Sequence, residues 1–197
     1  LFFLTFHVDM LLPFEQRFLL IHHDMNDHPS SYQTEYHITM LECKNRGAKT
    51  LAIVNVVGST IAKTADHTIY TWAGPEIAVA TTKGYTTQLA ILYLFALYAA
   101  KKTGRIDDAL YSSLLEALND LPKKVQQSID MNPEISALAK KYYKASSMFF
   151  LGRNTDYAVA LEGALKMKEI SYIHAEAYAA GELKHGTIAL IEEHTPV

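Results

Sequence analysis

The pattern of apolar and polar positions becomes regular from about residue 41. An apolar, β-branched run over residues 50–57 predicts a strand that is buried on both faces. Residues 67–72 alternate between apolar and polar side chains and predict a second strand, with a connector or short helix over 61–66. Basic residues followed by Gly47 predict that another helix ends just before the first of these strands.

Helical periods dominate the middle of the chain. Residues 86–103 are apolar almost all round, so they predict a long helix in a central position. Asp107 or Asp108 can cap a following helix. Pro122 predicts a kink or an end of that helix, and Pro133 predicts the first turn of another one, reaching about residue 144. Leucines spaced by three and four mark one helical face: Leu110, Leu114, Leu118 and Leu121.

The last quarter repeats the alternation of strand and helix. Residues 148–151 predict a strand, which is followed by a loop and a helix that runs from about residue 155 to 172. Residues 175–184 predict a further helix, broken at Gly186. Strands that alternate with helices predict the α/β class, with parallel sheets between two helical layers in an αβα arrangement.

Ligands of such sheets bind beyond the carboxyl ends of the strands, beside helix N-termini. The loops to examine are therefore residues 58–59, 73–82 and 152–155. No Gly-x-Gly-x-x-Gly or Walker motif is present, so no motif supports nucleotide binding.

Composition excludes several classes of protein. The chain is 49% hydrophobic and 20% charged, as in ordinary globular domains, and its net charge of −3 gives no basic excess for nucleic acid. The longest apolar run, residues 89–100, is shorter than the roughly 20 residues of a membrane span. Cys43 is the single cysteine and cannot form an internal disulfide, which favours a reducing, cytoplasmic location.

Residues 1–40 show no sustained period. The apolar clusters at 11–14 and 18–21 each predict one short strand or helix. Five of the nine histidines lie in this segment, but their spacing fits no ordinary ligand pattern, so we assign no metal site to them. The histidines are His7, His22, His23, His28 and His37.

Glu162, Lys166 and Glu169 are the first candidates for chemistry. Their spacings of four and three place them on one helical face. Such a face is typical of a solvated ion-pair ladder. If it lines a pocket instead, a carboxylate can act as a base while the lysine balances negative charge on a substrate.

His185 and the residues around Lys83 are further candidates. His185 can move protons near neutral pH, although a histidine beside a helix end is often a cap or a surface residue. Glu182 and His185 could share a metal, but no third ligand stands at a suitable spacing. Four hydroxyls surround Lys83 at the start of the predicted helix, those of Thr81, Thr82, Thr86 and Thr87. Hydroxyls at a helix start can bind an anion, whereas ordinary capping of the helix needs only one of them.

Three stretches resemble a known family. They are LAIVNVVGS at 51–59, AGPEIAVATTK at 73–83 and ALEGALKMKEISYIHAEAYAAGELKHG at 160–186. Together they resemble the isomerase half of the glutamine–fructose-6-phosphate aminotransferases, the glucosamine-6-phosphate synthases, over roughly residues 41–197. The resemblance implies a fragment of two sugar-isomerase (SIS) domains, the end of one over 41–144 and the beginning of the next over 145–197, with 1–40 unassigned.

The resemblance also implies an activity. In this family ammonia from glutamine is transferred to fructose 6-phosphate, which becomes glucosamine 6-phosphate, without a metal or redox cofactor. By motif, Glu169 is the base that moves a proton between C1 and C2, with Lys166 and Glu162 in the same wall. His185 assists ring opening and reaches the site of the neighbouring subunit in a homodimer. A glutaminase domain is expected in the parent chain.

The sugar-phosphate site carries over only in part. Val79, Ala80 and Thr81 match residues that line the sugar site, and Ser31 and Thr34 match two hydroxyls of the family's phosphate loop. Tyr32 stands where that loop has a glycine, whose absence can close the phosphate cradle. Likewise, Thr187 stands where the family has a proline after Lys-His-Gly.

Two other functional interpretations stay open. The segment fits a non-catalytic, sugar-phosphate-binding SIS module, or an inactive fragment of the enzyme. Because resemblance and periodicity both stop abruptly, we hypothesise that residues 1 to about 40 are an altered or out-of-frame stretch joined to a genuine family segment. A clean, in-frame read of the same forty residues in the source nucleic acid would contradict this hypothesis.

Overall fold

The computed structural model describes residues 18–23 and 31–197, with side chains from residue 36 onward. The chain divides into two compact units, residues 1–118 and 119–197, and each is described here by itself.

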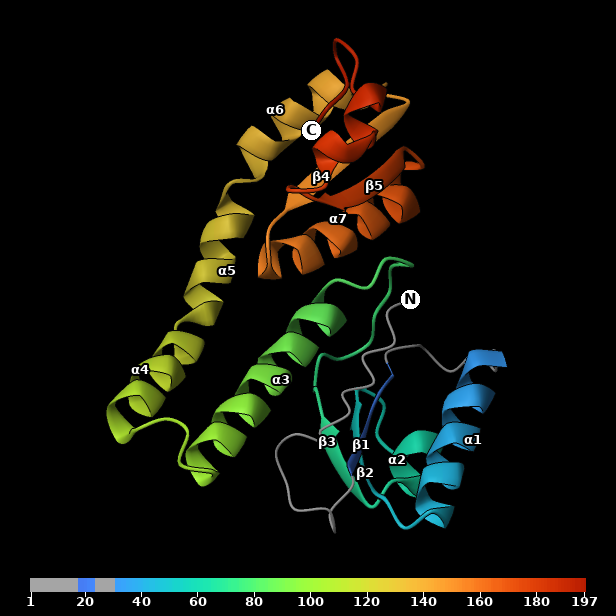
Figure 1. Ribbon diagram of the computed structural model, residues 1–197, viewed down its shortest axis with the longest axis vertical. Helices are drawn as coiled ribbons and strands as arrows, with labels where there is room; N and C mark the ends of the chain where they lie inside the picture. Colours follow the sequence, from blue (N-terminus) through green and yellow to red (C-terminus); the bar gives the residue numbers. More distant parts are fainter. Residues whose placement is uncertain (1–17, 24–30) are drawn as a thin grey trace. The chain divides into compact units, whose positions relative to one another are not determined.

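The first unit is built on a parallel sheet in the order β1-β2-β3 (Figure 1). Its strands are β1 (Phe18–His23), β2 (Lys49–Val54) and β3 (His67–Tyr70). The register of β1 on β2 runs from Phe18 opposite Lys49 to His23 opposite Val54. The strands predicted within 50–57 and 67–72 are therefore confirmed, although they end at Val54 and Tyr70. The cluster at 18–21, expected to be a strand or a helix, lies in strand β1, whereas the cluster at 11–14 lies outside the described residues.

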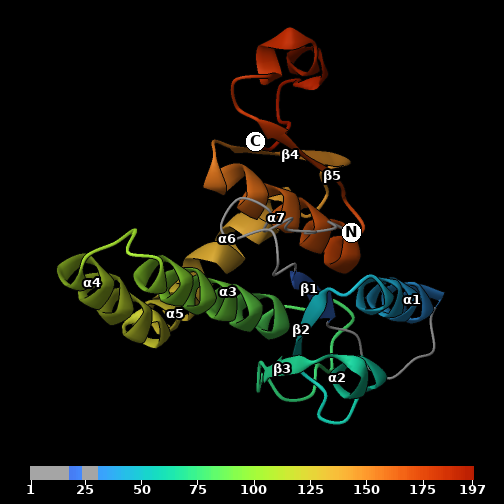
Figure 2. The ribbon, with the colours of Figure 1, turned by 60° about the horizontal axis from the view of Figure 1, so that its bottom comes forward.

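Helices α1 (Ser31–Asn45) and α2 (Thr60–Thr64) connect these strands. Both lie on one side of the sheet in Figures 1 and 2. Between them and the sheet packs a buried apolar cluster of Met40, Ala52, Val54 and Ile61. Met40 is fully buried, so α1, which runs across the expected boundary at residue 41, contributes to this core with a residue that precedes the boundary.

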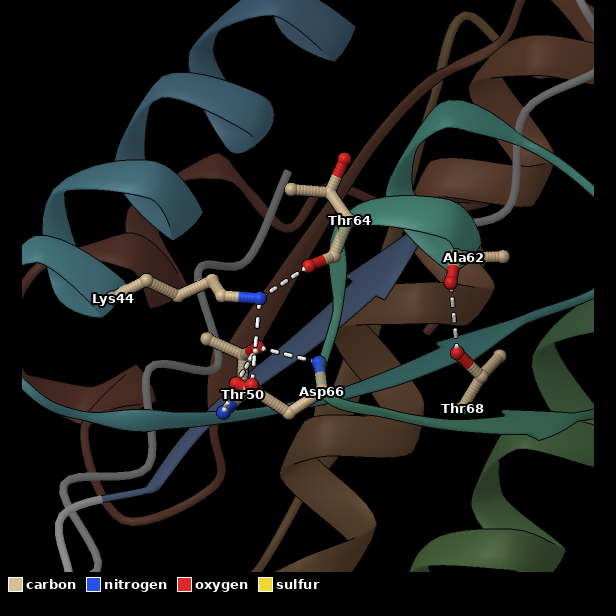
Figure 3. Close-up of polar contacts among 6 residues, drawn as sticks. All are labelled: Lys44, Thr50, Ala62, Thr64, Asp66 and Thr68. Atoms are coloured by element: carbon tan, nitrogen blue, oxygen red, sulfur yellow. Dashed lines mark hydrogen bonds and ion pairs between the residues drawn. The ribbon is translucent and has the colours of Figure 1, made fainter.

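A polar network ties the end of α1 to the turn before β3 (Figure 3). One carboxylate oxygen of Asp66 accepts hydrogen bonds from the Thr50 amide at 2.9 Å and the Thr50 hydroxyl at 2.7 Å. The Asp66 amide donates back to the Thr50 hydroxyl at 3.0 Å. Lys44 Nζ lies 3.4 Å from the other carboxylate oxygen and donates to the Thr64 carbonyl. These contacts hold the pKa of Asp66 at about 2, chiefly through the Thr50 hydroxyl and then the Thr50 amide.

Helices α3 (Lys83–Lys102) and α4 (Asp108–Asn119) follow the sheet. The cap predicted at Asp107 is confirmed, because its carboxylate accepts a hydrogen bond from the Leu110 amide at 2.7 Å. The predicted long helix exists, but its central position is not found: only Gly84 and Gln88 are buried in α3. Its large apolar side chains need a covering surface that the described residues do not supply, and several stay exposed, namely Tyr93, Leu94, Phe95 and Tyr98.

The second unit begins with helices α5 (Leu121–Asp130) and α6 (Asn132–Tyr142). Pro122 and Pro133 stand in their first turns, where a missing amide hydrogen costs nothing. A parallel pair follows, β4 (Ser147–Gly152) and β5 (His174–Ala179), connected by α7 (Thr155–Ser171). Both units therefore have parallel strands flanked by helices, which confirms the α/β class.

Strand β5 corrects one prediction. Residues 175–184 were expected to form a helix because alanine and glutamate favour helices. Instead, β5 pairs along its whole length with β4, from Ser147 opposite His174 to Gly152 opposite Ala179, and Ala175 becomes fully buried. Tertiary pairing therefore overrides local propensity here. Only short 3-10 turns follow, η1 (Leu183–His185) and η2 (Thr187–Leu190).

None of the described helices combines the length and the apolar character that a membrane crossing requires.

Candidate active site

Helix α7 is fixed tightly on its sheet. Ala160 and Ala164, one turn apart, are buried, and a side chain on Gly163 would stand 3.3 Å from the Phe150 ring. At the end of β4, a Cβ on Gly152 would lie 2.4 Å from backbone atoms at the start of α7. Glycine is required at this position because the helix begins directly against the strand.

Glu162, Lys166 and Glu169 lie on the face of α7 away from that packing, since the helix turns about 100° per residue. Lys166 Nζ is 2.6 Å from Glu169 Oε2 and 3.5 Å from Glu162 Oε1. The structure thus brings together the three α7 residues proposed from sequence. The two contacts differ, because the bond to Glu169 is short and that to Glu162 is a looser ion pair.

The cluster is sheltered from solvent, unlike an ordinary surface ladder. The exposed fractions of the side chains are 19% for Lys166, 24% for Glu162 and 29% for Glu169. Burial lowers the pKa of Lys166, but the hydrogen bond to Glu169 and the fields of both carboxylates outweigh it and raise the pKa above 10.5. Lys166 is therefore a fixed cation near neutral pH.

The chemistry open to this arrangement is proton transfer beside a fixed positive charge. Among the described residues, the hydrogen bond from Lys166 occupies Glu169 Oε2, and Oε1 of the same carboxylate makes none. A carboxylate oxygen of this kind can accept a proton from carbon α to a carbonyl, while the ammonium stabilises the negative charge that develops. No group of three or more metal-ligating side chains occurs in the described part of the chain, so Glu182 and His185 gain no third ligand.

His185 lies away from this cluster. It is exposed and ends η1, and its amide donates to the Glu182 carbonyl at 3.0 Å. In both ribbon views the 3-10 turns, drawn in red, lie across the β4–β5 sheet from α7 (Figures 1 and 2). Within the second unit, the structure therefore does not bring His185 to the carboxylates of α7.

The loop after β3 carries the expected sugar-site residues. Val79 is 93% exposed, Ala80 is buried and Thr81 is half-buried. Sequence reasoning missed Asn55, which directly follows β2. Its side-chain amide donates to the Gly74 carbonyl at 2.7 Å, and its oxygen accepts from the Thr71 hydroxyl at 3.0 Å. A polar amide inside the apolar run at 50–57 was the available signal for this loop anchor.

The start of α3 is capped in an unexpected way. The Thr82 amide donates to a carboxylate oxygen of Glu76 at 3.3 Å, and the Thr82 side chain makes no capping bond. Lys83 Nζ donates to the Pro75 carbonyl at 2.7 Å. The hydroxyls of Thr86 and Thr87 donate to carbonyls of the helix itself. Lys83 and the hydroxyls of Thr86 and Thr87 are thus engaged within the protein.

Ser31 and Thr34 occupy the first turn of α1, and their side chains lie outside the described residues. Helix α1 follows the carboxyl end of β1, and α2 and the Val79 loop follow β2 and β3. Since the strands are parallel, the carboxyl ends of β1, β2 and β3 lie at one edge of the sheet. At that edge the Ser59 hydroxyl caps α2 by accepting from the Ala62 amide.

Comparison with known proteins agrees with this architecture. The SIS-domain family profile matches residues 27–98 and 141–197, which is more than half of the chain. The chain belongs to the SIS-domain family. The match starts within the segment that the sequence analysis left unassigned, and the two matched ranges fall in different structural units.

Relatives of this SIS protein include the glutamine–fructose-6-phosphate aminotransferases (isomerizing) of Clostridium tetani and Caldanaerobacter subterraneus subsp. tengcongensis. The first is 54% identical over 156 residues, 79% of this chain and 26% of that protein. The second is 54% identical over 154 residues, 78% of this chain and 25% of that protein. The resemblance predicted from the motifs is confirmed, and the chain spans about a quarter of these relatives' length.

Among solved structures, the SIS chain is similar to the C-terminal domain of glucosamine-fructose-6-phosphate aminotransferase from Francisella tularensis. The TM-score is 0.82 at 35% sequence identity, and the match covers 90% of this chain and 49% of that one. The arrangement of elements therefore follows the SIS-domain part of such an enzyme.

Proposed function

We propose that the chain is part of the isomerase portion of a glutamine–fructose-6-phosphate aminotransferase, which turns fructose 6-phosphate and ammonia into glucosamine 6-phosphate. The observation that carries the proposal is the sheltered cluster of Glu162, Lys166 and Glu169, held on a helix that is anchored to its sheet. A simple binding module has no need of a carboxylate base beside a fixed cation.

In this proposal Glu169 is the base. It takes a proton from C1 of the open-chain sugar and returns it to C2, which converts a ketose skeleton into an aldose skeleton. Lys166, 2.6 Å away, stabilises the negative charge of the intermediate. Glu162 keeps the lysine charged and aligned from the next turn of α7.

The sugar phosphate binds at the carboxyl edge of the first unit's sheet. Its phosphate meets the first turn of α1, where Ser31 and Thr34 lie beside amides that have no partner within the helix. Val79, Ala80 and Thr81 line the sugar. Tyr32 stands where the phosphate loop of the family has a glycine, and this substitution predicts weaker phosphate binding than in the relatives.

His185 opens the sugar ring in the neighbouring subunit of a homodimer. Its exposure supports this role, because the turn η1 that carries His185 lies across the sheet from α7, and an exposed residue there can serve another subunit. Mixing His185→Ala subunits with Glu169→Gln subunits tests this role. Each variant alone should be inactive, and the mixed dimers should regain partial activity. Mixed dimers that remain inactive would contradict the role.

The overall function is tested by calorimetry with fructose 6-phosphate, followed by an isomerase assay with ammonia. Both are performed on this chain and on the longer aminotransferase that carries the segment. We expect the longer protein to bind and turn over the sugar phosphate. Binding without turnover would replace the proposal with a non-catalytic SIS module, and absence of both would defeat it. An inactive 197-residue chain beside an active longer protein would mark this segment as an incomplete site.

A further inference from the structure

The loop between β3 and α3 carries the residues proposed to line the sugar. It runs over residues 71–82 and contains no helix or strand (Figure 1). Val79 is 93% exposed, so packing of its own side chain does not hold it in place. Ala80 is 5% exposed and anchors the tip of the loop. Other contacts therefore set the path of the remaining loop residues.

Asn55 joins this loop to the sheet. It directly follows β2 and is half-buried. Its Nδ2 donates to the Gly74 carbonyl at 2.7 Å, and its Oδ1 accepts from the Thr71 hydroxyl at 3.0 Å. Because a carbonyl can only accept, the nitrogen end of the amide has to face Gly74, and the oxygen end then meets Thr71. Both ends of one amide are used, which fixes the side chain in a single orientation.

The backbone that Asn55 holds is strained. Trp72 has a φ of +53° and Gly74 has a φ of +73°, so the chain adopts the left-handed conformation twice within three residues. Glycine adopts this conformation freely, whereas a tryptophan does so at a cost in free energy. A conformation of this kind persists where surrounding contacts hold it, and strained backbone is concentrated at functional sites. Asn55 supplies such contacts on both sides of Trp72, at Thr71 and at Gly74.

Two further contacts join the beginning of the loop to the start of α3. Lys83 Nζ donates to the Pro75 carbonyl at 2.7 Å, and the Thr82 amide donates to a carboxylate oxygen of Glu76 at 3.3 Å. These contacts close the loop into a ring, but they do not connect the ring to the sheet. The bonds of Asn55 supply a connection of that kind, next to the carboxyl end of β2. The position of the ring relative to the sheet therefore depends on Asn55.

We propose that Asn55 is a positioning residue, which holds the Gly74 carbonyl and thereby sets where residues 79–81 meet the sugar. This role rests on the sugar site proposed above. A binding loop that already has its bound shape loses little conformational entropy when the ligand arrives. A looser loop has to be ordered by the ligand, and that ordering weakens binding. Asn55 supplies the order in advance without touching the substrate.

The first experiment measures order in the 197-residue chain through Trp72, the single tryptophan of the sequence. Asn55→Asp keeps the size of the side chain and the oxygen that accepts from Thr71, but it replaces the donor to Gly74 with an acceptor. We therefore expect the fast, local part of the fluorescence anisotropy decay of Trp72 to grow about twofold. Circular dichroism confirms that the variant is folded. Unchanged anisotropy in Asn55→Asp would overturn the proposal.

Thr71 supplies a second variant and its rescue. Thr71→Val removes the hydroxyl that orients Asn55 and should act in the same direction, whereas Thr71→Ser keeps a hydroxyl and should restore the anisotropy of the parent protein. Thr68→Val is the matched control, because Thr68 lies on β3 but its hydroxyl donates to the Ala62 carbonyl of α2 at 3.2 Å. An equal change in Thr68→Val would contradict the proposal, since the effect would then be general destabilisation.

The second experiment separates positioning from loss of folded protein in the longer aminotransferase. We expect Asn55→Asp to raise the KM for fructose 6-phosphate about tenfold and to leave kcat within about twofold, because the loop contacts the bound sugar while the base on α7 is unchanged. Calorimetry should show the same rise in the dissociation constant. A merely structural role would reduce the amount of active protein and leave KM as in the parent, and that result would contradict the proposal.

The two proposals fail in different ways. If the parent aminotransferase does not bind fructose 6-phosphate, the proposed function fails, and the anisotropy of Trp72 still decides whether Asn55 orders the loop. If the parent binds and converts the sugar phosphate while Asn55→Asp keeps the parental KM, only the positioning role fails. A raised KM together with a larger local motion of Trp72 supports both.

Discussion

Each unit of the molecule contains a lysine beside a carboxylate, and the two clusters differ in their hydrogen-bond partners. In the first unit, Asp66 accepts from the amide and hydroxyl of Thr50, while Lys44 donates to a carbonyl. Among the described residues, Lys166 in the second unit forms ion pairs with the carboxylates of Glu162 and Glu169 alone. The first cluster includes backbone groups among its hydrogen-bond partners, whereas these contacts of Lys166 in the second join side chains to one another.

This difference separates a structural cluster from a candidate reactive one. Backbone and hydroxyl partners connect α1, β2 and the turn before β3, and the Thr50 hydroxyl and amide hold the pKa of Asp66 at about 2. Side-chain partners leave Glu169 with an oxygen that is free among the described residues. Charge alone does not distinguish the two sites; the identity of the hydrogen-bond partners does.

The largest expected effect is on catalysis. Glu169→Gln keeps the shape of the side chain and removes the base, so isomerase activity in the aminotransferase should fall about 10²- to 10⁴-fold. Glu193→Gln, at a side chain that is 90% exposed, is the control and should keep its activity. Steady-state assays with fructose 6-phosphate and ammonia measure both variants. An active Glu169→Gln protein would make the α7 cluster structural, like that of the first unit.

Changes in the cluster of Lys44, Thr50 and Asp66 should lower the free energy of unfolding rather than the activity. Thr50→Val removes a fully buried hydroxyl and leaves the Asp66 amide without its acceptor, at a cost of about 1–3 kcal/mol. Urea denaturation followed by circular dichroism measures the loss. Thr103→Val, at an exposed hydroxyl that bonds within its own helix, should change stability much less. Equal stability of the two variants would contradict the structural role of the network.

Acid should affect the first unit through Asp66. Its pKa is lowered from 3.8 to about 2, so the stabilisation is fully present above about pH 4 and is lost as the pH falls towards 2. Asp66→Asn should therefore flatten the dependence of unfolding free energy on pH in this window. Urea titrations at successive pH values measure the slope. An unchanged slope would show that other carboxylates account for acid sensitivity.

The smallest expected effect concerns Lys166 in the second unit. Its raised pKa gives a stabilisation that is present below pH 10.5 and is lost as the pH rises further, the opposite direction to Asp66. Glu162→Gln removes one of the two carboxylates, at the longer contact of 3.5 Å, and should lower the pKa of Lys166 slightly. Nuclear magnetic resonance of the lysine side chain measures the shift, and a rise would contradict the assignment.

Local patterns predicted most of the elements but not their surroundings. The β-branched run over 50–57 and the spacing on α7 are each local patterns, and each predicted an element that exists, although the strand ends at Val54. The run at 175–184 did not, because its partner β4 lies more than twenty residues away and supplies the pairing that local propensity lacks. The apolar α3 likewise indicated a helix, yet its degree of burial depends on surfaces outside the helix.

The candidate site shows the same division. One helix carries Glu162, Lys166 and Glu169, so their spacing in sequence is enough to group them. The anchor from Asn55 to Gly74 spans nineteen positions, and the cap of α3 by Glu76 depends on the path of a loop. Contacts of this kind depend on the tertiary structure, and no periodicity of the sequence predicts them.

The close approach at Gly152 has a consequence for how the segment tolerates change. The atoms that a Cβ would meet at 2.4 Å belong to the backbone of Asp156 and Tyr157, not to a side chain. A substitution elsewhere can shrink a neighbouring side chain, but it cannot shrink a peptide group. Suppressor screens of a Gly152→Ala parent should therefore return true revertants, since no second-site exchange of side chains makes room for the added methyl group.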